Sequence, residues 1–220
     1  NLDLLFNVAK ATGNNSYKDI AVKHAMTTMN NHFRPDYTCW HVVSYNNDGT
    51  VEKKQTFQGK NDDSSWARGQ AWAVYGYTAC YRETKDTTFL NFAVKVADMI
   101  MERVKTDDAI PYWDYDAPVT DETPRDASAA SVTASALIEL STMVPDGNKY
   151  LDYAEQILKS LSSDAYLAKI GENQGFILMH STGSLPNGSE IDTPLNYADY
   201  YYLEALKRFM DLKGISYKNL

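Results

Sequence analysis

The sequence predicts an all-α fold made of helical hairpins, with one small β-hairpin inserted between them. Two patterns predict this fold. Amphipathic segments with apolar residues at three- and four-residue steps alternate with segments whose residues are apolar or small nearly all round, as in paired outer and inner helices. The inner-type segments begin near Ser65, Asp126 and Thr193, intervals too long for a short solenoid repeat, so hairpins stacked in a closed ring fit better. With 220 residues and 44% hydrophobic composition, the chain is large enough for one such domain.

The first half of the chain supplies four of the predicted elements. Residues 17–31 carry a weak amphipathic repeat and predict an outer helix. Residues 39–59 place apolar positions on both sides of Asn46-Asn47-Asp48-Gly49, which predicts a β-hairpin over one mouth of the ring. Residues 65–81 predict an inner helix capped by Ser64 or Ser65, and residues 89–104 predict an outer helix.

The second half repeats the alternation. Residues 128–143 predict an inner helix with Asp126 as its cap, and Pro145-Asp146-Gly147 separates it from an outer helix at residues 150–161. Residues 194–209 predict a third inner helix, with Thr193 as cap and Pro194 at its first position. The inner helices are expected to be buried nearly all round.

Charge and composition exclude several classes of partner. The formal net charge is −8, which would repel a phosphate backbone, so no nucleic-acid partner is expected. No apolar run approaches the ~20 residues that span a bilayer, so no membrane partner is expected. Cys39 and Cys80 are interpreted as reduced packing residues, and no cofactor is expected.

The remaining histidines and acidic residues are assigned structural roles. Cys39 and His41 lack a second pair at metal-ligand spacing, so no metal is expected. His24 and His32 are interpreted as surface or capping residues. Asp62-Asp63 is interpreted as a helix cap, and the acidic loop at residues 114–122 as a solvated turn, whereas Asp126 and Ser128 could cap the helix or line a pocket.

One segment combines the groups that bind sugars. Within about two and a half helical turns, Trp66, Arg68 and Trp72 supply two aromatic faces and a guanidinium. Aromatic rings pack on the C–H faces of sugars, and arginine binds carboxylates. The alternative is that the tryptophans are core residues and Arg68 is a buried ion-pair partner.

Longer motifs decide between these interpretations. The chain resembles the unsaturated glucuronyl hydrolases (glycoside hydrolase family 88) along essentially its whole length. The matching stretches are Gln58-Gly59, Asp62 through Trp72, Tyr75-Gly76, Pro124 through Ala130, Glu190-Ile191-Asp192, Pro194-Leu195, Tyr197 through Tyr201 and Leu203 through Leu206.

The resemblance implies a fold and an activity. It implies an (α/α)6 toroid of six hairpins, with residues 1–220 forming the C-terminal part of this single catalytic domain, so the ring is incomplete here. The implied reaction hydrates the C4=C5 bond of a 4,5-unsaturated uronic acid at the non-reducing end of lyase-generated oligosaccharides. Such an unsaturated uronide oligosaccharide is the expected partner, and a homodimer is left open. A bacterial cytoplasmic or periplasmic location is expected, with the compartment undetermined.

The resemblance also assigns site residues. The family's catalytic aspartate lies in an Asp-x-Met-Met-Asn-Leu stretch whose end matches Asn1-Leu2, so no catalytic residue is assigned within the chain. The residues expected to bind substrate are His41, Gln58, Trp66, Arg68, Trp72 and Ser181.

Two differences from the family pattern and three alternatives remain. Phe57 replaces a histidine often found before the Gln-Gly pair, and the loop around Ser181 lacks the lysine with which some relatives recognise sulfate. The alternatives are an unsaturated rhamnogalacturonyl hydrolase, an inactive carbohydrate-binding fragment and an unrelated helical scaffold. The sequence Arg-Gly-Gln-Ala-Trp favours the glucuronyl branch.

Overall fold

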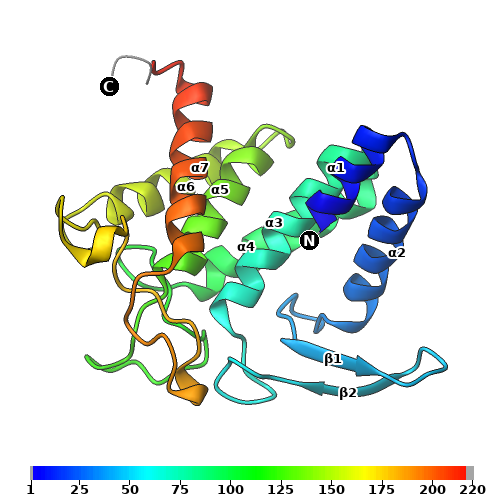
Figure 1. The fold of residues 1–220 in the computed structure, drawn as a ribbon, viewed down its shortest axis with the longest axis horizontal. Coiled ribbons are helices and arrows are strands. Elements are labelled where there is room, and N and C mark those ends of the chain that lie inside the picture. Colours follow the sequence, from blue (N-terminus) through cyan, green and yellow to red (C-terminus); the bar gives the residue numbers. More distant parts are fainter. Residues whose placement is uncertain (1, 217–220) are drawn as a thin grey trace.

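The computed structural model of the chain describes residues 2–216 and is mostly helical (Figure 1). The helices are α1 (Leu2–Thr12), α2 (Ser16–Asn31), α3 (Ala67–Thr84), α4 (Thr87–Arg103), α5 (Ala127–Ser141), α6 (Asn148–Leu161) and α7 (Asn196–Lys213), with short 3₁₀ turns at Asn173–Gly175 and Leu185–Asn187. All the helices predicted from the sequence are present. Helix α1 was not predicted, although Phe6 and Ala9, three residues apart, are both buried.

The helices pack as hairpins around a row of inner helices. Helix α1 packs on α2, α3 on α4, and α5 on α6, while α3, α5 and α7 pack side by side. Helix α5 can pack against three helices because alanine and serine cover most of its surface. Helices α3, α6 and α7 therefore approach it closely, and nearly all of its residues are buried. Large apolar side chains from the outer helices, including Phe89, Ile100, Tyr150 and Leu161, fill the core between the layers.

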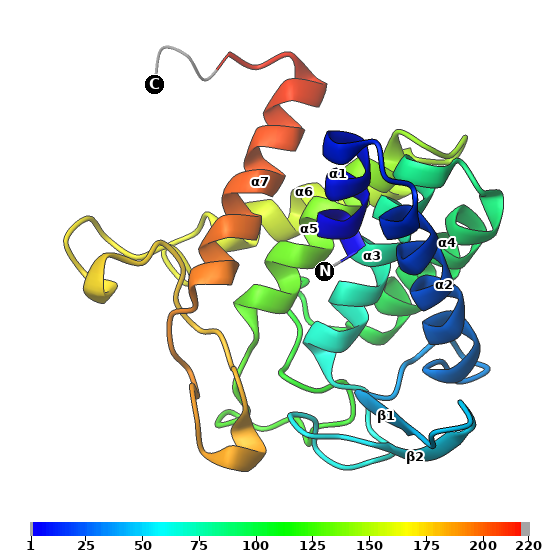
Figure 2. The same cartoon turned by 45° about the vertical axis from the view of Figure 1, so that its right-hand side comes forward.

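The predicted β-hairpin is confirmed. Strands β1 (Val42–Tyr45) and β2 (Val51–Gln55) pair antiparallel, with Val42 opposite Gln55. Gly49 closes the turn with a φ of +85°, a conformation that glycine adopts without a side-chain clash. In both views the hairpin lies at the same end of the molecule as the loops that precede α5 and α7, so the N-termini of α3, α5 and α7 point toward one group of connections (Figures 1 and 2).

Helix starts were predicted less well than helices. Asp126 is confirmed as a cap, because its carboxylate accepts from the backbone N–H of Ser128 and Ala129. Ser64 and Ser65 do not cap α3, whose N-cap is Trp66, because the Ser64 hydroxyl donates instead to Asp114 at 2.7 Å. The Thr193-Pro194 prediction is also wrong, since α7 begins at Asn196 after an extended Leu195.

Two burial predictions and one further cap prediction also fail. Helix α7 buries only Ala198, Tyr202 and Ala205 among its residues, whereas Tyr200 is 60% exposed. Asp114 is buried rather than solvated and accepts from the N–H of Lys60 as well as from Ser64. The Asp62-Asp63 pair caps no helix, because Asp62 accepts from the N–H of Thr56 after β2 and Asp63 N–H donates to Asn61.

No helix within residues 2–216 combines the length and the apolar character needed to cross a bilayer.

Candidate functional site

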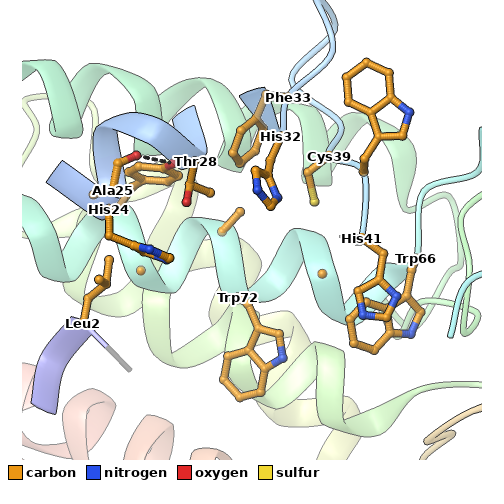
Figure 3. Close-up of a pocket in the computed structure, with 15 residues that line it drawn as sticks. Leu2, His24, Ala25, Thr28, His32, Phe33, Cys39, His41, Trp66 and Trp72 are labelled. Atoms are coloured by element: carbon orange, nitrogen blue, oxygen red, sulfur yellow. Dashed lines mark hydrogen bonds between the residues drawn. The ribbon is translucent and has the colours of Figure 1, made fainter. Parts of the chain in front are cut away.

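A cavity of about 430 Å³ lies between α1, α2, α3 and the segment before β1. Figure 3 shows His41 and Trp66 at one end and His24 with Leu2 at the other. Gly69 and Gly76 of α3 line the cavity; a Cβ atom at Gly76 would meet nothing within 4 Å, whereas one at Gly69 would lie 3.0 Å from the Trp66 ring. The aromatic rings of Trp66, Trp72 and Tyr77 form much of its apolar wall.

His41 is held as a neutral imidazole. Its Nδ1 accepts hydrogen bonds from the backbone N–H of Phe57 (3.2 Å) and Gln58 (3.1 Å), so these bonds assign the ring proton to Nε2. Burial, and secondarily the charge of Arg68, lowers the pKa of His41 to about 4. The ring stacks on Trp66 with centroids 4.2 Å apart. A neutral, oriented N–H donor therefore lines the cavity at pH 7.

Gln58, which follows β2, links the end of the β-hairpin to the loop before α7 by a hydrogen bond. Its side-chain amide donates to the carbonyl oxygen of Gly183 at 2.9 Å, while its backbone holds His41. The residue is half-buried and lies beside the cavity rather than on its wall. Gln58 thus fixes the position of His41 relative to a segment distant in sequence.

Trp66 and Trp72 both line the cavity, as predicted for aromatic walls. Trp66 is 7% exposed, and its ring is covered by His41 on one face. Trp72, one and a half turns into α3, is half-buried and meets the edge of Tyr201 at 5.2 Å between centroids. Of the two rings, Trp72 has more surface left for a ligand.

Arg68 forms a buried ion pair. The residue is 2% exposed, and its Nη1 lies 2.6 Å from Asp126 Oδ2 and 3.2 Å from the Ser128 hydroxyl. Asp126 is fully buried, and its second oxygen caps α5. The interpretation of Arg68 as a buried ion-pair partner is therefore the one that the geometry supports, and Asp126 and Ser128 are its partners.

The same guanidinium holds the loop before α7. Nη1 donates to the carbonyl of Thr182 and Nη2 to the carbonyl of Gly183, each at 2.7 Å. The guanidinium carbon also lies 4.6 Å from the Trp66 ring centroid. Arg68 thus joins α3, α5 and this loop beneath the His41–Trp66 stack.

Ser181 is not brought to the cavity. Its backbone pairs with Thr193, the residue is fully buried, and its hydroxyl has no hydrogen-bond partner. The neighbouring Thr182 hydroxyl donates to the Arg125 carbonyl. A contact between Ser181 and substrate stays a prediction.

His24 and His32, which were interpreted as surface or capping residues, also line the cavity: His24 is exposed, and His32 is the C-cap of α2. His24 and His32, together with Thr28, lie at four-residue steps on one face of α2 and its C-cap. Burial, followed by the charges of His24 and Lys54, lowers the pKa of His32. The spacing of these three residues was the signal that could have placed them together.

No group of three or more His, Cys, Asp or Glu side chains in the described part of the chain is arranged to hold a metal ion.

Comparison with known proteins places these features in context. The model of Glycosyl Hydrolase Family 88 matches residues 1–214. The chain is 49% identical over 214 residues to an unsaturated glucuronyl hydrolase of Formosa agariphila, covering 96% of this chain and 53% of that protein. It is 32% identical to an unsaturated chondroitin disaccharide hydrolase of Streptococcus pyogenes, covering 95% of this chain and 53% of that protein.

Solved structures of related proteins have the same fold as this chain. An unsaturated glucuronyl hydrolase described as specific for heparin superposes with a TM-score of 0.95 at 55% identity, covering 97% of this chain and 58% of that one. The enzyme from Bacillus sp. GL1 gives a TM-score of 0.89 at 28% identity, covering 97% and 57%. These likenesses confirm the predicted all-α fold of the toroid type with a small β-hairpin. The chain spans about half the length of the curated relatives it matches.

Proposed function

The chain belongs to Glycosyl Hydrolase Family 88, and from this premise we propose that the protein hydrolyses oligosaccharides that end in a 4,5-unsaturated uronic acid. The observation that carries the proposal is the aromatic cavity in which a neutral His41 stacks on Trp66. Relatives named for chondroitin and heparin support a glycosaminoglycan-derived substrate.

The proposed reaction adds water across the C4=C5 double bond. A proton is transferred to C4 and the water oxygen bonds to C5. The resulting hemiketal opens, and the bond to the next sugar breaks as that sugar leaves with a hydroxyl. The route differs from displacement at the anomeric carbon by paired carboxylates.

We assign the proton transfer to an aspartate outside the 220 residues, in the part of the family's length that this chain does not span. Residues 1–220 would then be the C-terminal part of one catalytic domain. The chain itself contributes the wall of the site and the groups that orient the sugar.

Within this wall, the proposed roles follow from position. Trp72 offers a partly exposed ring for the sugar, and His41 Nε2–H donates to the uronide near the reacting carbons. Gln58 and Trp66 fix the His41 ring. Arg68 acts as a positioning residue, because its guanidinium is engaged by Asp126 and the 182–183 carbonyls.

Loss of ultraviolet absorbance from the conjugated C4=C5 bond tests the proposal. The protein at its full natural length is expected to bleach this absorbance with unsaturated glycosaminoglycan disaccharides, and to do so faster than with an unsaturated rhamnogalacturonan disaccharide. His41→Gln should lower kcat/KM by about 10²-fold. His180→Gln, whose histidine pairs with Asp192 away from the cavity, serves as the control. Absorbance that persists with every lyase product tried would contradict the proposal.

A further inference from the structure

The structure leaves the anionic part of a uronide substrate without the partner that the sequence suggested. Arg68 donates to Asp126 and to two carbonyl groups, so its charge is neutralised and most of its donors are used. Among the described residues that line the cavity there is no Asp, Glu, Lys or Arg. Recognition of an anion in this space must come from other donors.

Helix α2 places such donors along one wall. His24, Thr28 and His32 follow at four-residue steps, and all three line the cavity. Figure 3 shows both imidazoles extending from α2 into the space between that helix, Leu2 and Trp72. His24 is exposed and His32 half-buried, so both can be reached by a ligand. Imidazole N–H and hydroxyl groups donate hydrogen bonds to oxyanions.

Two cations close to this wall form no ion pair with any residue in the range 2–216. Arg34 and Lys54 stack on Trp40, a residue of the cavity wall, at 4.4 Å and 3.9 Å from its ring centroid. The hydrogen-bond acceptors of Arg34 are uncharged: the Thr38 hydroxyl and the backbone carbonyls of residues 39, 62 and 64.

The acidic residues around these cations form no ion pair with them. No carboxylate in the described part of the chain pairs with Arg34 or Lys54. Asp36 accepts from the N–H and hydroxyl of Thr38, and against the effect of burial these hydrogen bonds, followed by the charges of Arg103 and Arg34, lower its pKa. Glu52, two residues before Lys54 on β2, forms no ion pair with it. In a chain of net charge −8, this local excess of positive charge favours an anion.

We propose that His24 and His32, backed by the charge of Lys54, form an oxyanion subsite that binds a sulfate ester or carboxylate of the substrate. The inference rests on the proposed function and deepens it, because it makes the α2 wall the determinant of preference for charged oligosaccharides. Lys54 supplies its charge from β2, the strand that follows the turn of the β-hairpin.

The electrostatics of His32 agree with this role. Its pKa is lowered by burial and by the charges of His24 and Lys54, while Tyr45 is the aromatic neighbour at 6.4 Å. A bound oxyanion supplies the missing opposite charge and therefore raises the pKa of His32. Binding of an oxyanion at the subsite can therefore be followed by NMR as a rise in the pKa of His32.

Selectivity for sulfated substrate is the first test. The protein at its full natural length is assayed with an unsaturated uronyl-hexosamine disaccharide and with its sulfated counterpart. His32→Gln and Lys54→Gln are expected to reduce the ratio of kcat/KM for sulfated over unsulfated substrate by about tenfold and threefold respectively. Lys53→Gln is the matched control, because Lys53 is the adjacent residue on β2, faces the opposite side of the strand and is exposed. An unchanged ratio in both His32→Gln and Lys54→Gln overturns the sulfate assignment.

The second test identifies the oxyanion and does not need turnover. Histidine NMR signals are followed during titration with inorganic sulfate, and separately with acetate. A rise in the pKa of His32 with sulfate assigns the subsite to a sulfate ester, and a rise only with acetate assigns it to a carboxylate. No shift with either anion overturns the subsite. If the anion shifts occur but no disaccharide is hydrolysed, the proposed function fails while the subsite stands.

Discussion

Replacing Arg68 by methionine is expected to lower the free energy of unfolding by about 3–5 kcal/mol, because it leaves the charge of Asp126 buried without a partner. The Arg68 side chain is 3% exposed and that of Asp126 is fully buried. The carbonyls of Thr182 and Gly183 also lose their donors, at a cost of about 1–3 kcal/mol each that does not add fully to the first cost.

Urea unfolding followed by tryptophan fluorescence measures this loss. The double variant Arg68→Met/Asp126→Asn removes the unpaired charge, so it should recover part of the stability lost in Arg68→Met. Arg103→Met is the matched control: its pair with Asp116 is 31% and 40% exposed, and its loss should cost about 1 kcal/mol or less. If Arg68→Met costs no more than Arg103→Met, the assignment of Arg68 as a positioning residue is refuted.

Three further predictions follow from burial and packing. The folded-state pKa of His41 is about 4 against 6.5 unfolded, so the unfolded chain binds more protons and stability falls as pH drops from 6.5 to 4; His41→Gln should flatten this dependence in unfolding experiments. Burial raises the pKa of Cys39 and Cys80 to about 12, so neither should react with iodoacetamide at pH 8 until urea unfolds the chain. Gly59→Ala should cost about 1–3 kcal/mol in urea unfolding, because the new methyl would lie 2.6 Å from the Thr56 hydroxyl. Gly76→Ala meets nothing within 4 Å and should be neutral or stabilising.

The helices could be predicted because their signal is local. The three- and four-residue repeats at residues 89–104 and 150–161 depend only on neighbouring positions, and both became the outer helices α4 and α6. Helix starts depend on distant competitors. Ser64 had the right side chain to cap α3, but Asp114, 50 residues away, accepts its hydroxyl. A pattern within one segment does not contain that contact.

Burial of α7 shows a second limit of sequence reasoning. Its tyrosines and alanines have the composition of an inner helix, yet only the sides that face α5, α6 and the Trp72–Tyr75 part of α3 are covered in the described structure. Tyr200 and Leu203 are 60% and 51% exposed. Composition indicates what a surface can pack against, whereas burial depends on which neighbours are present.

The motif at residues 66–72 leaves the role of Arg68 open. The spacing of Trp66, Arg68 and Trp72 is compatible both with an arginine that holds a uronide and with an arginine buried in an ion pair. The choice depends on partners 58, 114 and 115 residues further along the chain, which reach Arg68 only after α5 and the loop before α7 have packed on α3. The same packing removes a charged donor from the cavity and leaves the α2 wall as its polar side. A residue judged within its own helix does not reveal which neighbours it will meet: the partners of Arg68 come from α5 and the loop before α7, and the cavity beside His24 and His32 is completed by α1, α3 and the segment before β1.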